Sequence, residues 1–330
     1  MKWTADRVLG LARGYQTAAL LAAAADLELF DAMAGGRRTA GQVARRIRGD
    51  RRAVTIVLDA LAALHLVSKS GNEYAVPADV AASLTSGGRN SVLAMSQHHA
   101  NCMRRWAQLA RVAATGEPAE RAPSIRGARK DAAAFIGGMH DLNSRIAPGI
   151  VRDIQPLPFS HLLDVGGASG TWTIAFLEAN PRGRATIFDL PHVIPMARRR
   201  LRKLKLAGRV RLAAGDFYRD ELPAGADLAW VSAIAHQNSR GQNRELFRRV
   251  FRALVPGGRI AIRDVVMEES RTAPLAGALF AVNMLVATPK GGTFTLRELR
   301  ADLRSAGFAG ARLVRRGEGN DSVVVARRRI

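Results

Sequence analysis

A glycine-rich segment follows an apolar run near the middle of the chain and reads DVGGASG, from Asp164 to Gly170. No lysine follows its glycines, as a phosphate-binding P-loop requires, and no serine stands at the GxSxG spacing of a nucleophile elbow. The GxGxxG spacing of dinucleotide sites, counted from Gly166, falls on Ala168 and Thr171. The remaining pattern is an acid at a strand end followed by small residues, which lets backbone approach a ligand.

A second acid, Asp189, ends the next apolar run, 25 residues after Asp164. An acid near this distance beyond a glycine-rich turn accepts hydrogen bonds from ribose hydroxyls. The start of the helix after the turn suits a carboxylate, because free backbone N–H groups point out of it. A nucleoside that carries an amino acid and no phosphate therefore fits the two segments.

A histidine and an acid accompany two later apolar runs. His236 stands just after the run 227–232, and Asp264 lies near the end of 259–266. A histidine is an apt general base near neutral pH, and a carboxylate can orient it. Two alternatives compete with this interpretation: a lone histidine is more often structural, and Asp264 could pair with the adjacent Arg263 instead.

The charge balance bears on partners. Lys and Arg number 50 against 28 Asp and Glu, which gives a formal net charge of +22. Such a charge attracts nucleic acid when it gathers on one surface. Here the arginines are spread over several predicted helices, so we expect solvated faces and no nucleic-acid partner.

Other features concern metals, membranes and location. Cys102 is the single cysteine and no HExxH spacing occurs, so we expect no metal site and a reducing compartment. The first thirty residues contain neither a signal-peptide pattern nor an apolar run long enough to span a bilayer. We therefore expect a cytoplasmic protein without a membrane partner.

The N-terminal part is predicted to be helical with a small wing. An alanine-rich helical stretch covers 15–33, the capping-box spacing of 39–42 opens a second helix, and 51–67 forms a third. Two short strands follow within 67–76. This winged-helix pattern can dock on DNA. The third helix, however, is apolar around most of its circumference, which favours a dimerisation module.

From Leu162 onward, short apolar runs alternate with amphipathic helices, as in a mostly parallel sheet covered by helices on both faces. Ligands bind such sheets at the carboxyl ends of the strands. The expected strands are 162–165, 185–189, 210–213, 227–232, 259–266, 311–316 and 322–328. The expected helices are 171–180, 194–205, 240–254 and 295–306.

These patterns divide the chain into three parts. Residues 1–90 are expected to form the winged-helix dimerisation domain, and 91–155 a helical linker that contributes to the substrate pocket. Residues 156–330 are expected to form the cofactor-binding catalytic domain.

The chain resembles the class I S-adenosylmethionine-dependent methyltransferases, and more narrowly the small-molecule O-methyltransferase family of the caffeate and acetylserotonin enzymes. The order and spacing of several segments carry the resemblance over nearly the whole chain. It implies an α/β fold with a Rossmann-like, mostly parallel seven-stranded sheet, an N-terminal helical winged-helix dimerisation domain, S-adenosylmethionine as cofactor and an intertwined homodimer. The segments are LAAAADLELFDAM, TAGQVARRI, LLDVGGASGTWTIAFLEANP, IFDLPHVI, GDFYRDELPAGADLAWVSAIAHQ, RALVPGGRIAIRD and LRELRADLRSAGF.

The resemblance also implies which residues hold the cofactor. Asp189 and Leu190 receive the ribose, Asp216 accepts from the exocyclic amine of adenine, and Phe217 stacks on it. Ser232 stands where the family commonly has a basic residue near the cofactor carboxylate. The implied cofactor contacts are Asp164, Gly166, Gly170, Asp189, Leu190, Asp216, Phe217 and Ser232.

By the same resemblance, His236 is the general base and Asp264 its acidic partner. The sequence departs from the family at this point. The usual His-Asp-Trp is His236-Gln237-Asn238, and Thr293 replaces a second acid. These departures leave three alternatives open: transfer to carbon, transfer to nitrogen and a non-methylating use of the cofactor.

The resemblance also places thioether and ring side chains at positions where the family holds a flat acceptor, and such side chains suit an aromatic face. For a single methionine, a place in the hydrophobic core is the alternative. The implied acceptor contacts are Phe135, Met139, His140, Asn143, Asn283 and Met284.

The sequence thus predicts an S-adenosylmethionine-dependent O-methyltransferase that methylates a hydroxyl of a small aromatic or polyketide-like molecule, with His236 as general base. One alternative is a C- or N-methyltransferase acting on a ring. Another is a winged-helix nucleic-acid-binding protein that uses the cofactor as a signal.

Overall fold

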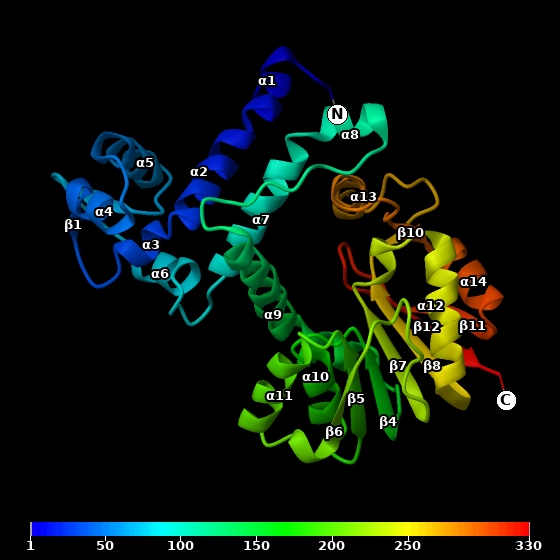
Figure 1. Ribbon diagram of the computed structural model, residues 1–330. Helices are drawn as coiled ribbons and strands as arrows, with labels where there is room; N and C mark the ends of the chain where they lie inside the picture. Colours follow the sequence, from blue (N-terminus) through cyan, green and yellow to red (C-terminus); the bar gives the residue numbers. More distant parts are fainter. Residues whose placement is uncertain (1, 330) are drawn as a thin grey trace. The chain divides into compact units, whose positions relative to one another are not determined.

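The computed structural model describes residues 2–329, which fold into two compact units (Figure 1). One unit contains the chain up to Gln108 together with Glu120–Leu142; the other contains Leu109–Ala119 and the chain from Asn143 onward. None of the helices formed by residues 2–329 is both long and apolar enough to cross a membrane.

The first unit is helical apart from one small sheet. Its three short strands are antiparallel and lie in the order β1-β3-β2. The elements are α1 (Ala5–Arg13), α2 (Tyr15–Asp26), α3 (Leu29–Ala32), β1 (Arg38–Thr39), α4 (Ala40–Ile47), α5 (Arg51–Ala63), β2 (Ser68–Ser70), β3 (Glu73–Ala75), α6 (Ala78–Leu84) and α7 (Leu93–Trp106). Helix α9 (Ala128–Asp153) begins in this unit and ends in the other.

Local signals place the helices of this winged-helix region. Thr39 and Gln42 form the expected capping box at the start of α4, and Asp50 caps α5 by accepting from the N–H of Ala53 at 2.8 Å. The two wing strands β2 and β3 lie where they were predicted. Strand β1 was not predicted, because its two residues carry too little pattern to indicate a strand.

The predicted helix over 15–33 is divided in the structure. Glu28 adopts a left-handed backbone with φ of 54°, and this ends α2 and starts α3. A left-handed residue breaks the repeat of helical hydrogen bonds. The side chains of Leu29 and Phe30 are then buried in the cluster of the winged-helix region.

The second unit is built on a seven-stranded sheet in the order β11-β12-β8-β7-β4-β5-β6. Strand β12 alone runs antiparallel to its neighbours, so the expected mostly parallel α/β sheet is confirmed. The strands are β4 (His161–Val165), β5 (Arg184–Asp189), β6 (Val210–Ala214), β7 (Ala226–Ser232), β8 (Leu254–Asp264), β11 (Phe308–Arg315) and β12 (Ser322–Arg328).

Helices cover both faces of this sheet (Figure 1). Residues of α10, α11 and the end of α9 pack on one face, and residues of α12 and α14 pack on the other. The helices are α8 (Leu109–Thr115), α10 (Thr171–Ala179), α11 (Ile194–Lys203), α12 (Arg240–Ala253), α13 (Leu275–Ala287) and α14 (Leu296–Ser305), with the 3-10 turns η1 (Ala207–Arg209) and η2 (Ala235–Gln237) and the short paired strands β9 (Val266–Met267) and β10 (Phe294–Thr295).

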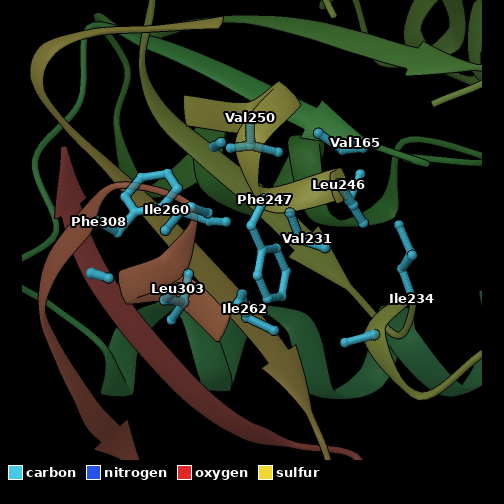
Figure 2. Packing of buried hydrophobic residues seen from close by; sticks show 14 of the residues in the cluster. Val165, Val231, Ile234, Leu246, Phe247, Val250, Ile260, Ile262, Leu303 and Phe308 are labelled. Atoms are coloured by element: carbon cyan, nitrogen blue, oxygen red, sulfur yellow. The ribbon is translucent and has the colours of Figure 1, made fainter. Parts of the chain in front are cut away.

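The core between the sheet and α12 is shown in Figure 2. Phe247 of α12 is fully buried among apolar side chains that include Ile262 of β8 and Leu303 of α14. Its neighbours Leu246 and Val250 belong to the same cluster, as the 3.6-residue period of a helix requires. This packing fixes the end of β7 and the turn that carries His236.

We predict that Phe247→Ala lowers the free energy of unfolding by about 3–5 kcal/mol, because it leaves a cavity in a close-packed core. Urea unfolding monitored by circular dichroism measures the change. Arg248→Ala, on the exposed side of the same helix, is the control and should shift it by less than about 0.5 kcal/mol. Equal effects of the two variants would contradict the packing described here.

Candidate active site

His236 and Asp264 meet at the carboxyl edge of the sheet. His236 lies on η2, just beyond β7, and its Nδ1 is 2.8 Å from Oδ1 of Asp264 at the end of β8. The backbone N–H of His236 also donates to Oδ2 of the same carboxylate, at 3.1 Å. Both side chains are buried. The carboxylate therefore binds both the ring and the backbone of His236, and it leaves Nε2 as the ring nitrogen that faces other groups.

The alternative pairing of Asp264 with Arg263 does not occur in the structure. Side chains alternate between the two faces of a strand, so neighbours in sequence point in opposite directions. Asp264 turns toward His236, whereas Arg263 turns to the face that carries α10 and lies over the ring of Trp172. The histidine thus has Asp264 as its partner.

Helix α13 supplies a ring beside the histidine that the sequence analysis missed. The ring of Phe280 packs edge-on against His236, with centroids 4.8 Å apart. Asn283 and Met284 follow on the same helix, three and four residues later, so they share a face with Phe280. Sequence analysis could have found Phe280 from its four-residue spacing to Met284.

The glycine turn after β4 is tight and leaves its backbone bare. Gly166 and Gly170 both have positive φ, of 65° and 77°. A Cβ atom on Gly166 would lie 2.8 Å from Ile234 Cδ1 and 3.4 Å from Phe217 Cε1, so no side chain fits there. Ile234 and Phe217 thus fill the side of Gly166 where a side chain would stand, and the turn can be this tight only because glycine occupies the position.

Asp164 lies beneath this turn. Its Oδ2 accepts from Thr173 Oγ1 at 2.6 Å, and a Cβ atom on Gly167 would lie 2.8 Å from its Cγ. Burial raises the pKa of Asp164 to about 7, and the hydrogen bond from Thr173 opposes this shift. In this structure Asp164 supports the turn from below.

Asp189 connects the turn to the end of β5. Its Oδ2 accepts from the N–H of Ala168 and its Oδ1 from the N–H of Leu190, both at 2.7 Å. Burial raises the pKa of Asp189, and the two backbone N–H groups counter it. Leu190 is partly exposed beside it. The carboxylate is thus held at the carboxyl edge, where each oxygen keeps a second lone pair for a ligand hydroxyl.

Asp216 and Phe217 follow β6 at the same edge. Asp216 Oδ1 accepts from the N–H of Tyr218 at 2.9 Å, which closes a short turn. The ring of Phe217 packs against the core cluster and lies near Gly166. The structure therefore brings Phe217 to the glycine turn, as a surface for stacking needs.

Ser232 ends β7, and its side chain already has a partner. Its Oγ accepts a hydrogen bond from Nη1 of Arg263 at 3.1 Å. The two residues are paired across β7 and β8. Ser232 was expected at the cofactor, but its contact with a cation of the next strand was not predicted.

The departures from the family pattern have structural partners. Asn238 is buried and donates from Nδ2 to Asn243 Oδ1 at 3.0 Å. Gln237 donates from Nε2 to the carbonyl of Ala233 at 3.0 Å. Thr293 is buried, and its carbonyl accepts from Arg271. Gln237 and Asn238 thus brace the turn that carries His236, and none of the three residues adds a second carboxylate to it.

The implied acceptor contacts fall in both units. Phe135, Met139 and His140 lie on the part of α9 in the first unit, where the ring of Phe135 is 5.0 Å from that of His98. Asn143 lies on the part of α9 in the second unit. Within that second unit, Asn283 and Met284 share α13 with the ring that contacts His236.

Comparison with known proteins agrees with this architecture. Residues 123–309 match the family model of an O-methyltransferase domain, and residues 9–86 match that of an O-methyltransferase dimerisation domain. The chain is 30% identical over 323 residues to 3-hydroxy-5-methyl-1-naphthoate 3-O-methyltransferase of Streptomyces sahachiroi, covering 96% of this chain and 93% of that protein.

Two further similarities are informative. The chain is 29% identical over 332 residues to the N,N-dimethyltransferase OxyT of Streptomyces rimosus, covering 97% of this chain and 94% of that protein. Its fold is similar to human N-acetylserotonin methyltransferase in complex with SAM, with a TM-score of 0.84, 24% identity, and 100% and 99% of the two chains covered. The expected fold and family are confirmed: the chain belongs to the S-adenosylmethionine-dependent O-methyltransferase family.

Proposed function

We propose that this methyltransferase methylates a hydroxyl group of a small aromatic or polyketide-like molecule, with His236 as general base. The observation that carries the proposal is the buried pair of His236 and Asp264, whose Nδ1 and Oδ1 atoms are 2.8 Å apart. The naphthoate O-methyltransferase among its relatives supports an aromatic hydroxyl acceptor.

The histidine performs the proton transfer in this proposal. Nδ1–H of His236 donates to Asp264, which fixes the tautomer and leaves the lone pair of Nε2 for the acceptor hydroxyl. Taking up the proton makes the ring a cation, which the Asp264 carboxylate stabilises in a buried site. Phe280 keeps water from one side of the ring. The imidazolium then releases its proton to solvent.

The residues around the glycine turn fit S-adenosylmethionine. The tight glycine turn brings Phe217 beside Gly166, where its ring can stack on the adenine, and Asp189 can accept from the ribose. We assign Leu190 and Asp216 to the same site, at the ribose and at the adenine. When bound, the cofactor supplies an electrophilic methyl group on a sulfonium.

The acceptor contacts and the division of labour along the chain are also proposals. Thioether and ring side chains suit a flat acceptor, which supports the assignment of Met139, Phe135 and Met284 to its binding. We assign His140, Asn143 and Asn283 to its polar groups. Residues 1–90 serve dimerisation, 91–155 serve acceptor binding and 156–330 serve cofactor binding and catalysis.

A homodimer is supported by apolar side chains that the chain leaves exposed at its N-terminus. No residue of α1 is buried, and Trp3, Leu11 and Tyr15 are all more than half exposed. Val8 and Leu11 of α1 and Tyr15 at the start of α2 recur at helical three- and four-residue spacing, because Gly14 between the two helices also has a helical backbone. A second copy would cover this face, in agreement with the matched dimerisation domain.

Transfer to nitrogen is the second candidate. The relative OxyT is an N,N-dimethyltransferase at nearly the same identity as the naphthoate enzyme. An amine acceptor that binds in its neutral form needs no base before transfer. The base His236 therefore separates the two candidates.

We predict that His236→Ala lowers turnover by roughly 10²- to 10⁴-fold on a hydroxyl acceptor, because it removes the general base. Asp264→Asn should act in the same direction but more weakly, since it only orients and stabilises the ring. The loss should shrink as the pH approaches the acceptor's own pKa, because a phenolate needs no base.

Steady-state assays with a panel of phenols and amines measure this effect, and cofactor affinity by calorimetry is the control that should stay unchanged. Full activity of His236→Ala on its best acceptor would refute the base and favour the nitrogen acceptor.

We predict that Asp189→Ala weakens S-adenosylmethionine binding by on the order of 1–3 kcal/mol, the cost of leaving hydroxyl groups unpaired in a buried site. Isothermal titration calorimetry measures the affinity, and a thermal unfolding curve checks that the turn at Ala168 still folds. An unchanged affinity would remove Asp189 from the ribose site.

We predict a dimer at micromolar concentration in static light scattering. Leu11→Glu should dissociate it, because a charge on this apolar face would be buried in the interface. Arg13→Glu, a charge change at another position of the same helix, should leave the dimer intact. A monomeric wild-type chain would contradict the proposed assembly.

A further inference from the structure

Arg263 is a buried cation at the carboxyl end of β8. Its side chain is only 3% exposed, and burial lowers its pKa to about 10. An arginine in such a place is costly unless an anion or several acceptors surround it. Its partners therefore indicate what it is for.

The guanidinium is only partly satisfied within the chain. Nη1 donates to Ser232 Oγ at 3.1 Å, and the central carbon lies 4.7 Å from the centre of the Trp172 ring. Nε is buried without a hydrogen-bond acceptor among residues 2–329. One neutral hydroxyl and one ring face do not replace a counter-anion.

The nearby acids are engaged elsewhere. Asp264 accepts from His236 and from the N–H of Val265. Asp321 lies close enough to act on Arg263, but its Oδ2 is bound by Nη1 of Arg315 at 2.8 Å. Within the described part of the chain, Arg263 makes no salt bridge.

The position of Arg263 matches one part of the cofactor. Its neighbours are Ser232 at the end of β7 and Trp172, the second residue of α10, the helix that begins directly after the glycine turn. S-adenosylmethionine carries a carboxylate on its methionine portion, and this group needs donors at the edge that binds the nucleoside. A guanidinium is the side chain best shaped to bind a carboxylate.

We propose that Arg263 binds the carboxylate of the methionine portion of S-adenosylmethionine. This rests on the cofactor site proposed above. In this proposal the positive charge at the carboxylate comes from β8, because Ser232 at the end of β7 is neutral. The hydroxyl of Ser232 instead holds the guanidinium in place. Trp172 supports the guanidinium from its other side by a cation–π contact.

The test compares two ligands that differ only in this carboxylate: S-adenosylmethionine and its decarboxylated form, which keeps the ammonium and the sulfonium. Binding is measured by calorimetry, without turnover. The wild-type protein should bind the decarboxylated ligand roughly 10- to 100-fold more weakly, the range of a charge-assisted hydrogen bond. Equal affinities in the wild type would overturn the proposal without any variant.

Arg263→Met should weaken S-adenosylmethionine binding by the same roughly 10- to 100-fold and leave binding of the decarboxylated ligand unchanged. Arg259→Met removes an arginine from the middle of β8, four residues before Arg263, and should change neither affinity. A variant that weakened both ligands equally would show that Arg263 only supports the fold, and this too would overturn the proposal.

Two further variants sharpen the result. Asp189→Ala should weaken the binding of both ligands by the same factor, because both carry the ribose. If it does not, the ribose assignment of Asp189 is wrong and the proposal for Arg263 is unaffected. Arg200 donates to Thr171 at the start of α10 and is the rival cation. Selective loss of S-adenosylmethionine binding in Arg200→Met, with none in Arg263→Met, would overturn the proposal.

A relocated charge provides the last check. Because Ser232 and Arg263 are paired across β7 and β8, a lysine at position 232 can reach the same space. Adding Ser232→Lys to Arg263→Met should restore the preference for the carboxylated ligand. Absence of any recovery, in a double variant whose unfolding curve matches that of Arg263→Met, would count against a charge-based role.

Discussion

Two opposite charges stand next to each other at the end of β8, and the alternation of the strand sends them to opposite faces of the sheet. Asp264 therefore meets His236 on one side, and Arg263 meets Ser232 and Trp172 on the other. If Asp264 and Arg263 paired with each other, His236 would lose its carboxylate partner and the opposite face would lose its cation. The strand thus separates the carboxylate that contacts His236 from the buried cation on the opposite face.

The glycine turn depends on a similar balance of buried acids. Asp164 lies below the turn and Asp189 beside it, and burial raises the pKa of both. Each is held by short bonds, Asp164 by the hydroxyl of Thr173 and Asp189 by the N–H groups of Ala168 and Leu190. Asp189 is the closer of the two to the surface, and the dipoles of these two backbone N–H groups compensate the charge of its carboxylate.

Much of the architecture follows from local signals. The apolar runs predicted all seven strands of the large sheet, and Thr39 with Gln42 predicted the start of a helix. The His236–Asp264 contact was predicted from a family pattern and from the rule that strand ends meet at one edge. Helix α13, the break at Glu28 and the burial of Arg263 were not predicted, because burial, backbone strain and side-chain direction depend on contacts distant in sequence.

The single carboxylate at His236 bears on the class of acceptor. The resemblance to the family places Thr293, a neutral residue, where a second acid is usual, so in the proposed mechanism Asp264 alone would compensate the imidazolium. Free histidine has a pKa of about 6.5 and a free phenol one of about 10, so proton transfer between them costs about 5 kcal/mol. For a hydroxyl as weakly acidic as water, near 15.7, the cost is about 12 kcal/mol. Of these two classes of hydroxyl, the phenolic one is therefore the less costly for an imidazole base to deprotonate.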